Sequence, residues 1–129
     1  MSSLHNASIV SIVDDDESVR LATASLIRSL GWCVQLYASA EAFLRSPEFG
    51  QTACVVCDIQ MPGMTGLEMQ AELVASGNRL PIIFVTAFPS DAAQRRANEN
   101  GAHFFLHKPV DAAEFTRCLR SILGSEQTQ

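Results

Sequence analysis

Positive charge is scarce in this 129-residue chain: nine lysines and arginines stand against fourteen acidic residues, which leaves a net charge of −5. Such a balance argues against nucleic-acid binding by this domain itself. No apolar run is long enough to cross a bilayer, and the first six residues, Met-Ser-Ser-Leu-His-Asn, lack the apolar core of a signal peptide. We therefore expect a cytoplasmic protein that does not span a membrane.

Cysteine is also sparse, with four residues in the chain. Cys54 and Cys57 form one C-x-x-C spacing, but both lie inside an apolar run that is typical of a buried strand. We therefore interpret all four as reduced, mostly buried residues rather than as a redox or zinc site. The other two are Cys33 and Cys118.

Length and composition predict a single globular domain. The chain is 47% hydrophobic and 18% charged, which is enough apolar material for a core and too little charge for disorder. No internal repeat, low-complexity stretch or linker interrupts residues 1–129. We expect a core over about residues 8–123, followed by a tail or the start of a linker at 124–129.

Apolar runs and amphipathic segments alternate along the chain. Short apolar runs predict strands, whereas apolar residues at helical spacing followed by glycine predict helices. Ser39, and either Ser90 or Asp91, are the expected helix caps. The predicted strands are 9–13, 33–37, 53–57, 82–85 and 103–106, and the predicted helices are 17–30, 39–44, 67–75, 91–100 and 111–123.

Five strand–helix units joined by short loops predict an α/β fold of the flavodoxin-like, doubly wound type. Its five-stranded parallel sheet would have the order 2-1-3-4-5 and five helices on its two faces. In open sheets of this kind, ligands bind beyond the carboxyl ends of the strands, where the strand order reverses. Here that position lies between the first and third strands.

Polar side chains follow the predicted strands at this edge. Asp14, Asp15 and Asp16 end the first strand, and Asp58 ends the third. Clustered carboxylates repel one another unless a cation lies among them, and Mg²⁺ prefers such oxygen ligands. Thr86 after the fourth strand and Lys108 after the fifth add a hydroxyl and an ammonium group. This set suits phosphoryl transfer to a carboxylate.

At these positions the chain resembles the receiver domain of two-component response regulators. The matching segments occur in the order and spacing of that family over about residues 8–123. Any one of them is a weak signal, but the ordered set is specific. They are Ile-Val-Asp-Asp-Asp (12–16), Cys-Asp-Ile-Gln-Met-Pro-Gly-Met-Thr-Gly (57–66), Val-Thr-Ala (85–87) and Lys-Pro (108–109).

The resemblance implies roles for the acidic residues. Asp58 would accept a phosphoryl group from a phosphohistidine of a sensor histidine kinase, in a reaction that needs Mg²⁺. Asp15 and Asp58 would bind the ion directly, Asp14 would act nearby or through water, and the backbone carbonyl of Gln60 would be a further ligand. We expect Asp16 to serve mainly as a helix cap or a tuning residue.

The resemblance also implies a switch and an output. Thr86 and Lys108 would contact the phosphate, and Phe105 would occupy the aromatic switch position. Phosphorylation would change the face formed by the fourth helix, fifth strand and fifth helix, which could support a homodimer. The output would be transcription, controlled through a C-terminal DNA-binding domain beyond this chain, or protein contact by a stand-alone regulator. Such a domain catalyses only its own phosphorylation and dephosphorylation and is not otherwise an enzyme.

Other interpretations of these residues stay open at this point. The Asp14–Asp16 run alone is typical of a solvated helix N-terminus, and Phe105 is equally a core residue. Asp14-x-Asp16 also has the spacing of aspartate-nucleophile phosphohydrolases, in which Asp14 would be the nucleophile and the further acids needed would be Asp111 and Glu114. A flavin-binding module is disfavoured because acids after the first strand repel a phosphate.

Two side chains that flank Asp58 bear on the lifetime of a phosphoryl group. Gln60 follows it by two residues, and Phe88 follows Thr86 by two residues. A bulky apolar Phe88 would hinder the attacking water, so we expect slow hydrolysis.

Overall fold

A computed structural model describes residues 8–124 and contains one five-stranded sheet in which every strand pair is parallel. The strand order is β2-β1-β3-β4-β5, which confirms the predicted doubly wound fold. The first and third strands are therefore neighbours at the centre of the sheet. The strands are β1 (Ile9–Val13), β2 (Cys33–Tyr37), β3 (Thr52–Asp58), β4 (Ile82–Thr86) and β5 (Phe104–His107).

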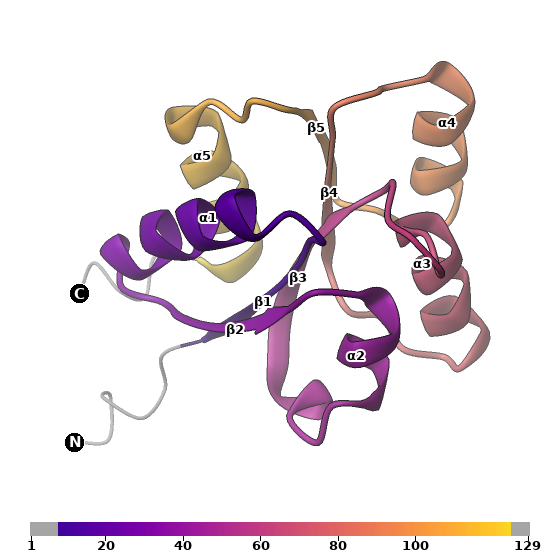
Figure 1. Cartoon of the computed structure of the whole chain (residues 1–129), viewed down its shortest axis with the longest axis horizontal. Coiled ribbons are helices and arrows are strands. Elements are labelled where there is room, and N and C mark those ends of the chain that lie inside the picture. The colour runs from indigo at the N-terminus through magenta and orange to yellow at the C-terminus, as the bar shows by residue number, and fades with distance from the viewer. Residues whose placement is uncertain (1–7, 125–129) are drawn as a thin grey trace.

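Helices cover both faces of the sheet, as right-handed crossovers require. Helices α1 and α5 lie on one face, and α2, α3 and α4 lie on the other (Figure 1). One short 3₁₀ helix, η2, leads into β3. The bounds are α1 (Glu17–Ser29), α2 (Ala40–Arg45), η2 (Phe49–Gln51), α3 (Gly66–Ala75), α4 (Asp91–Glu99) and α5 (Ala112–Leu123).

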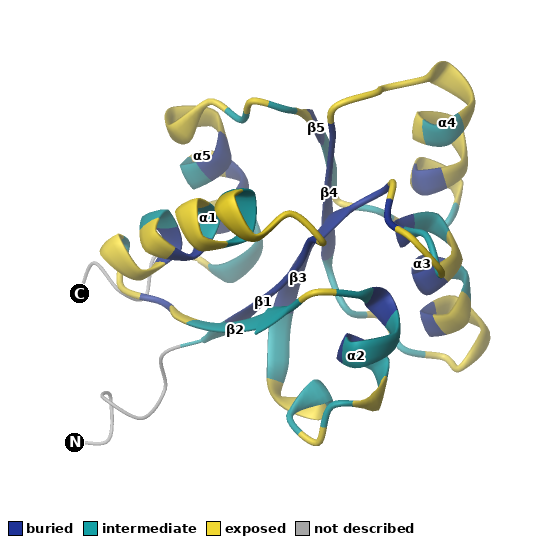
Figure 2. Ribbon diagram, in the orientation of Figure 1, coloured by how far each residue is buried: buried dark blue, intermediate teal, exposed yellow. Residues whose placement is uncertain are grey.

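The sheet separates two hydrophobic clusters. Beneath α1 and α5, the cluster includes Ile12, Ile27 and Phe115; on the opposite face it includes Phe43 and Met69. Figure 2 shows the resulting gradient, with the central strands buried and the outer helix surfaces exposed. A strand that is buried on both faces has to be apolar throughout, which explains the continuous runs in β3 and β4.

Helix α4 differs from the other long helices in how little it buries. It is strongly polar, and Ala97 is its one fully buried residue. Ala93 packs only partly against the same core. Arg95 and Arg96 are exposed, as expected for a solvated helix face. A polar contact adds to this attachment, because the buried Gln70 of α3 donates from Nε2 to the carbonyl of Ala97 at 3.0 Å.

Side-chain caps define the helix starts. Asp16 accepts a hydrogen bond from the amide of Val19, which confirms the expected capping role. Ser39 and Ser90 cap α2 and α4 in the same way. Thr65 and Glu68 form a reciprocal capping box at the start of α3.

The strand ends differ slightly from the prediction, and hydrogen bonds explain why. Strand β3 includes Asp58, because the amide of Ile59 still donates to the carbonyl of Val85 beyond it. Strand β4 includes Thr86, whose carbonyl accepts from the amide of Lys108 at 2.8 Å. Strand β5 lies one residue later than predicted, and the η2 turn has no clear periodic signal.

Among the described residues, Cys54, Cys57 and Cys118 are buried and Cys33 is exposed, and all four have free thiols. This matches the expectation of mostly buried cysteines. Between residues 8 and 124, no helix is both long and apolar enough to cross a membrane. The expected tail lies outside the described residues apart from Gly124, which ends α5.

Candidate functional site

Three carboxylates converge at the carboxyl edge of the sheet. One oxygen each of Asp14, Asp15 and Asp58 lies within 4.8 Å of the other two. Asp14 and Asp58 are buried, whereas Asp15 is exposed to solvent. The predicted clustering of acids from the first and third strands is therefore present in the fold.

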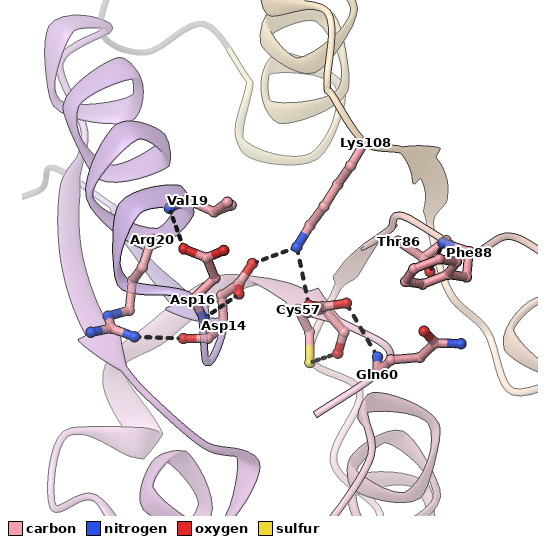
Figure 3. Close-up of polar contacts among 10 residues, drawn as sticks. Asp14, Asp16, Val19, Arg20, Cys57, Gln60, Thr86, Phe88 and Lys108 are labelled. Carbon is pink, nitrogen blue, oxygen red and sulfur yellow. Dashed lines mark hydrogen bonds and ion pairs between the residues drawn. The ribbon is translucent and has the colours of Figure 1, made fainter. Parts of the chain in front are cut away.

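Lys108 reaches into this cluster from the end of β5. Its Nζ atom donates to Oδ2 of Asp14 at 2.9 Å and to Oδ2 of Asp58 at 3.0 Å (Figure 3). The side chain of Lys108 is 17% exposed, that of Asp14 3% and that of Asp58 10%. One ammonium group thus offsets part of the repulsion between two buried carboxylates.

The sheet register brings these groups together. Val13 pairs with Cys57, so the residues that follow them, Asp14 and Asp58, emerge side by side. The loop after β1 is fixed by its own backbone, because the amide of Asp14 donates to the carbonyl of Tyr37 at 3.1 Å. The amide of Asp16 donates to Oδ1 of Asp14 at 2.9 Å, which orients the carboxylate.

Burial affects the protonation of Asp58 and of its partner Lys108. It raises the pKa of the Asp58 carboxyl, and the hydrogen bond and positive charge of Lys108 offset only part of this rise. Burial alone would lower the pKa of Lys108, but the two carboxylates that accept its hydrogen bonds raise it. The neighbouring Cys57 thiol has a raised pKa because it is buried beside acids, and it donates to the carbonyl of Asp58 at 3.2 Å.

The loop after Asp58 packs closely against the strand that precedes it. The amide of Gln60 donates to Oδ1 of Asp58 at 3.2 Å, and the amide of Gly66 donates to the carbonyl of Ile59 at 2.9 Å. A Cβ atom at position 66 would run into the carbonyl oxygen of Asp58 and would lie 3.0 Å from Cα of Ile59. Glycine is therefore required there for a close backbone approach.

Thr86 is buried at the end of β4, next to the strand that carries Asp58. Its Oγ1 accepts a hydrogen bond from the amide of Phe88 at 3.1 Å, so the hydroxyl shapes the loop that leads to α4. Phe88 itself is 71% exposed and borders the site in Figure 3.

Phe105 lies on β5 in a half-buried position. Its ring centroid is 6.5 Å from that of Phe84 and 6.4 Å from that of His107. The ring of Phe105 thus packs against the hydrophobic core on one side and against the exposed His107 on the other. This position is compatible with a core role and with a switch role.

An apolar cavity of about 490 Å³ lies beside the acidic cluster, between α1, α5 and the sheet. Asp14 and Lys108 contribute to its wall, so it adjoins the site directly. Ala22 of α1 is exposed where the helix borders the cavity. Cavities of this volume with mostly apolar walls are typical binding surfaces. The apolar lining includes Ile12, Val19, Leu26, Val56, Val85 and Phe115.

The donor set fits a magnesium ion. Hard oxygen donors within reach of one another are the ligands that Mg²⁺ prefers, and it commonly takes one or two carboxylates with waters and phosphate oxygens. By contrast, two acids needed for the phosphohydrolase interpretation serve other purposes: the side chains of Asp16 and Asp111 cap α1 and α5.

Two contributors to the site have no recognisable signal in the sequence. Arg20 donates from Nη1 to the carbonyl of Asp14 at 2.7 Å. Glu41 accepts a hydrogen bond at Oε2 from the amide of Met64, in the loop after Asp58. Both partners are backbone atoms, which no side-chain motif reveals.

Comparison with known proteins gives a consistent result. A family model described as the response regulator receiver domain matches residues 10–120. The response regulator protein TodT of Pseudomonas putida is 35% identical over 117 residues, which cover 91% of this chain and 52% of TodT. The transcriptional regulatory protein FixJ of Azorhizobium caulinodans is 37% identical over 120 residues, covering 93% of this chain and 57% of FixJ.

A solved structure agrees with these relatives. The structure of the response regulator StyR superposes with a TM-score of 0.81 at 38% identity, covering 95% of this chain and 63% of that one. The chain thus spans about half the length of the curated relatives that it matches.

Proposed function

The chain belongs to the response regulator receiver domain family, and on that premise we propose that Asp58 accepts a phosphoryl group from a phosphohistidine of a sensor histidine kinase. The reaction is Mg²⁺-dependent. The observation that carries the proposal is the bridge from Lys108 to Asp14 and Asp58, at 2.9 and 3.0 Å. Together with Asp15 of the same cluster, this bridge surrounds the Asp58 carboxylate with one ammonium group and two further acids, the arrangement that transfer to that carboxylate needs.

Asp14, Asp15, Asp58 and the backbone carbonyl of Gln60 would hold the ion. When bound, Mg²⁺ supplies positive charge to the oxygens of the transferring group. Asp15 and Asp58 would bind it directly, and Asp14, already engaged by Lys108, acts nearby or through water. The three carboxylates and one ammonium group carry a net charge of about −2, which a divalent cation neutralises.

In the transfer step, an oxygen of Asp58 forms a bond to phosphorus as the bond from phosphorus to the donor nitrogen breaks. Lys108 stabilises the phosphoryl oxygens, and it already lies within hydrogen-bond distance of the acceptor. The hydroxyl of Thr86 donates to a phosphoryl oxygen from the neighbouring strand. The chain thereby catalyses its own phosphorylation and dephosphorylation, with no other substrate.

Phosphorylation replaces one carboxylate charge by roughly −1.5 to −2. We propose that Thr86 then turns toward the phosphoryl group and that Phe105 moves inward from its half-buried position. The face formed by α4, β5 and α5 carries the resulting signal, and it supports a phosphorylation-dependent homodimer. Phosphorylation of Asp58 shifts the equilibrium between two conformations of the domain that both exist without it.

The kinase docks, in this proposal, at the apolar cavity between α1 and α5. That cavity opens beside Lys108 and Asp14, so a protein seated there delivers its phosphohistidine next to Asp58. Apolar surface close to a reactive group is typical of a protein-binding site.

For the output we propose control of transcription, because relatives such as FixJ are transcriptional regulators. The DNA-contacting part would be a C-terminal domain that follows this receiver, since the net charge of −5 disfavours DNA binding by the receiver itself. A stand-alone regulator that acts by protein contact is the alternative. We place the protein in the cytoplasm, a reducing compartment that suits its four free cysteines.

Acetyl phosphate with Mg²⁺ tests the phosphoacceptor directly. Intact-mass spectrometry should detect one added phosphoryl group on the wild type and none on Asp58→Asn. No adduct should form when Mg²⁺ is chelated before acetyl phosphate is added. Sustained turnover of varied phosphate esters that is abolished by Asp14→Asn, but not by Asp58→Asn, would instead support a phosphohydrolase.

A further inference from the structure

The loop that follows Asp58 is held by a side chain from another element. The amide of Met64 donates to Oε2 of Glu41 at 3.0 Å, and the two residues are 23 positions apart. Glu41 lies in the first turn of α2 and is half-buried. Gly63, which has a φ of 75°, packs against the same atom, since a Cβ there would lie 2.8 Å from Oε2 of Glu41.

The other hydrogen bonds of this loop are mostly local. Gln60 bonds to the Asp58 side chain, and Thr65 donates from its amide to Glu68 at 2.8 Å within the capping box of α3. The amide of Ile59, directly after β3, donates to the carbonyl of Val85 in β4. Within the described residues 8–124, Glu41 therefore makes the hydrogen bond that ties the second half of the loop, residues 61–65, to a different element.

A carboxylate suits this position. An ionised acceptor forms a stronger hydrogen bond with a backbone amide than a neutral one does. Hydrogen bonds from the backbone amides of Glu41 and Met64 lower the pKa of the Glu41 carboxyl, so it stays ionised in neutral solution.

We propose that Glu41 is a positioning residue for the acidic site: by holding Gly63 and Met64 it fixes the loop that carries Gln60, and so maintains the geometry in which Mg²⁺ binds. The inference rests on the proposed function, because it concerns the same ion. Glu41 itself lies outside the three-carboxylate cluster and acts through the backbone of the loop. Residues that orient metal ligands in this way commonly affect metal affinity strongly.

Two substitutions separate the hydrogen bond from the charge. Glu41→Ala removes both, whereas Glu41→Gln removes the charge but keeps an oxygen that can accept from Met64. We expect Glu41→Ala to weaken Mg²⁺ binding by about threefold to tenfold, and Glu41→Gln by less than about twofold, as measured by isothermal titration calorimetry. An equal loss in both variants would show a through-space charge effect and would overturn the positioning role.

A matched control uses the helix that follows the loop. Glu72 is exposed on α3, and its side chain makes no hydrogen bond or ion pair with any residue from 8 to 124. Glu72→Ala should therefore leave Mg²⁺ affinity within experimental error of the wild type. A loss as large as that of Glu41→Ala would mean that any removed acid has this effect, and it would contradict the proposal.

A second readout needs no metal ion. In Mg²⁺-free protein, the amide of Met64 should exchange with solvent at least about tenfold faster in Glu41→Ala than in the wild type. The amide of Ala42, which donates to Ser39 at the start of α2, should keep its protection and so show that the helix is intact. Unchanged exchange at Met64 would overturn the inference.

A double-mutant cycle tests the proposal even if the Glu41→Ala substitution itself destabilises α2. Gly63→Ala places a methyl group against Oε2 of Glu41 and strains a positive φ. Combined with Glu41→Ala, its effect on Mg²⁺ affinity should be smaller than in the wild-type background, because the steric conflict is gone. Independent, multiplicative losses would show that the two sites are not coupled.

The outcomes also distinguish this inference from the proposed function. If Mg²⁺ binds the wild type and Asp58 is phosphorylated, but Glu41→Ala matches the wild type in affinity and exchange, then only the positioning role is wrong. If the wild type does not bind Mg²⁺, both proposals are wrong.

Discussion

The Nζ atom of Lys108 lies 2.9 Å from Oδ2 of Asp14, although 94 residues separate the two in the sequence. The same ammonium group reaches Asp58 at 3.0 Å, so Lys108 shares its charge between two carboxylates. The charge of Lys108 therefore offsets only part of the free-energy cost of burying the ionised Asp58 carboxylate.

Asp58→Asn should stabilise the metal-free protein at neutral pH. Burial raises the pKa of Asp58 in the folded chain, so the folded state loses stability as pH rises from the ordinary aspartate value through this raised value. The neutral amide removes this cost, and the midpoint of thermal unfolding should rise by a few degrees at pH 7. The gain should vanish below about pH 4, where the carboxyl is protonated in both states. An equal gain at both pH values would contradict this account.

Mg²⁺ provides the companion measurement for the same variant. A ligand that binds only the folded state raises its stability, so excess Mg²⁺ should raise the unfolding midpoint of the wild type. The shift should be much smaller in Asp58→Asn, which lacks one carboxylate of the cluster.

Gly66→Ala should destabilise the fold by about 2 kcal/mol or more, because its methyl group would run into the backbone of Asp58 and Ile59. Urea unfolding measures this effect. Gly50→Ala is the matched control: nothing lies within 4 Å of its added Cβ, and it should change stability by no more than about 0.5 kcal/mol. Similar values for both variants would show that the close approach at residue 66 has no energetic role.

Phe105→Ala should uncouple phosphorylation from its output. The ring contacts Phe84 but does not touch the acidic cluster, so Asp58 should still be phosphorylated by acetyl phosphate at about the wild-type rate. Phosphorylation-dependent dimerisation, measured by analytical ultracentrifugation, should fall by about tenfold or more. Unchanged dimerisation would show that Phe105 is a core residue without a switch role.

Phe88→Ala should shorten the lifetime of phosphorylated Asp58, by about twofold to fivefold, because the ring no longer hinders water. The hydrogen bond from the amide of Phe88 to Thr86 involves only the backbone of residue 88 and is retained, so the variant isolates the side chain. Phe88→Leu restores an apolar bulk and should behave like the wild type. The lifetime is measured by following the decay of the phosphorylated protein with mass spectrometry. A lifetime of Phe88→Ala no shorter than that of the wild type would show that the Phe88 ring does not hinder hydrolysis.

Ala22→Arg should slow phosphotransfer from the kinase by about tenfold, since it places a charged side chain at the rim of the apolar cavity. Phosphorylation by acetyl phosphate should not change, because this small donor needs no docking surface. Leu21→Arg is a control on the same helix, since Leu21 is 49% exposed and does not line the cavity. If Ala22→Arg slowed phosphorylation by the kinase and by acetyl phosphate equally, the substitution would have damaged the phosphorylation site itself and not a docking surface.

The sequence allowed the fold and the acidic cluster to be predicted for one physical reason. The carboxyl ends of parallel strands meet at one edge, so acids after β1 and β3 and a lysine after β5 had to converge. The helix cap at Asp16 was predictable because capping is local to one turn.

Other contacts could not be predicted in this way. Arg20 and Glu41 act on backbone atoms, and Glu41 does so from an element 23 residues away. Their contacts depend on how helices seat against loops, which hydrophobic periodicity does not encode. The η2 turn and the one-residue shift of β5 likewise depend on tertiary hydrogen bonds.

Helix α4 is attached to the domain chiefly through a buried methyl group, that of Ala97, and a buried amide, that of Gln70. A helix with so small an apolar footprint gives up little hydrophobic free energy when it slides or tilts. The amide contact is directional, so displacement breaks it abruptly rather than gradually. Displacing α4 therefore costs the domain less hydrophobic free energy than displacing a helix with a larger buried face, such as α5, would cost.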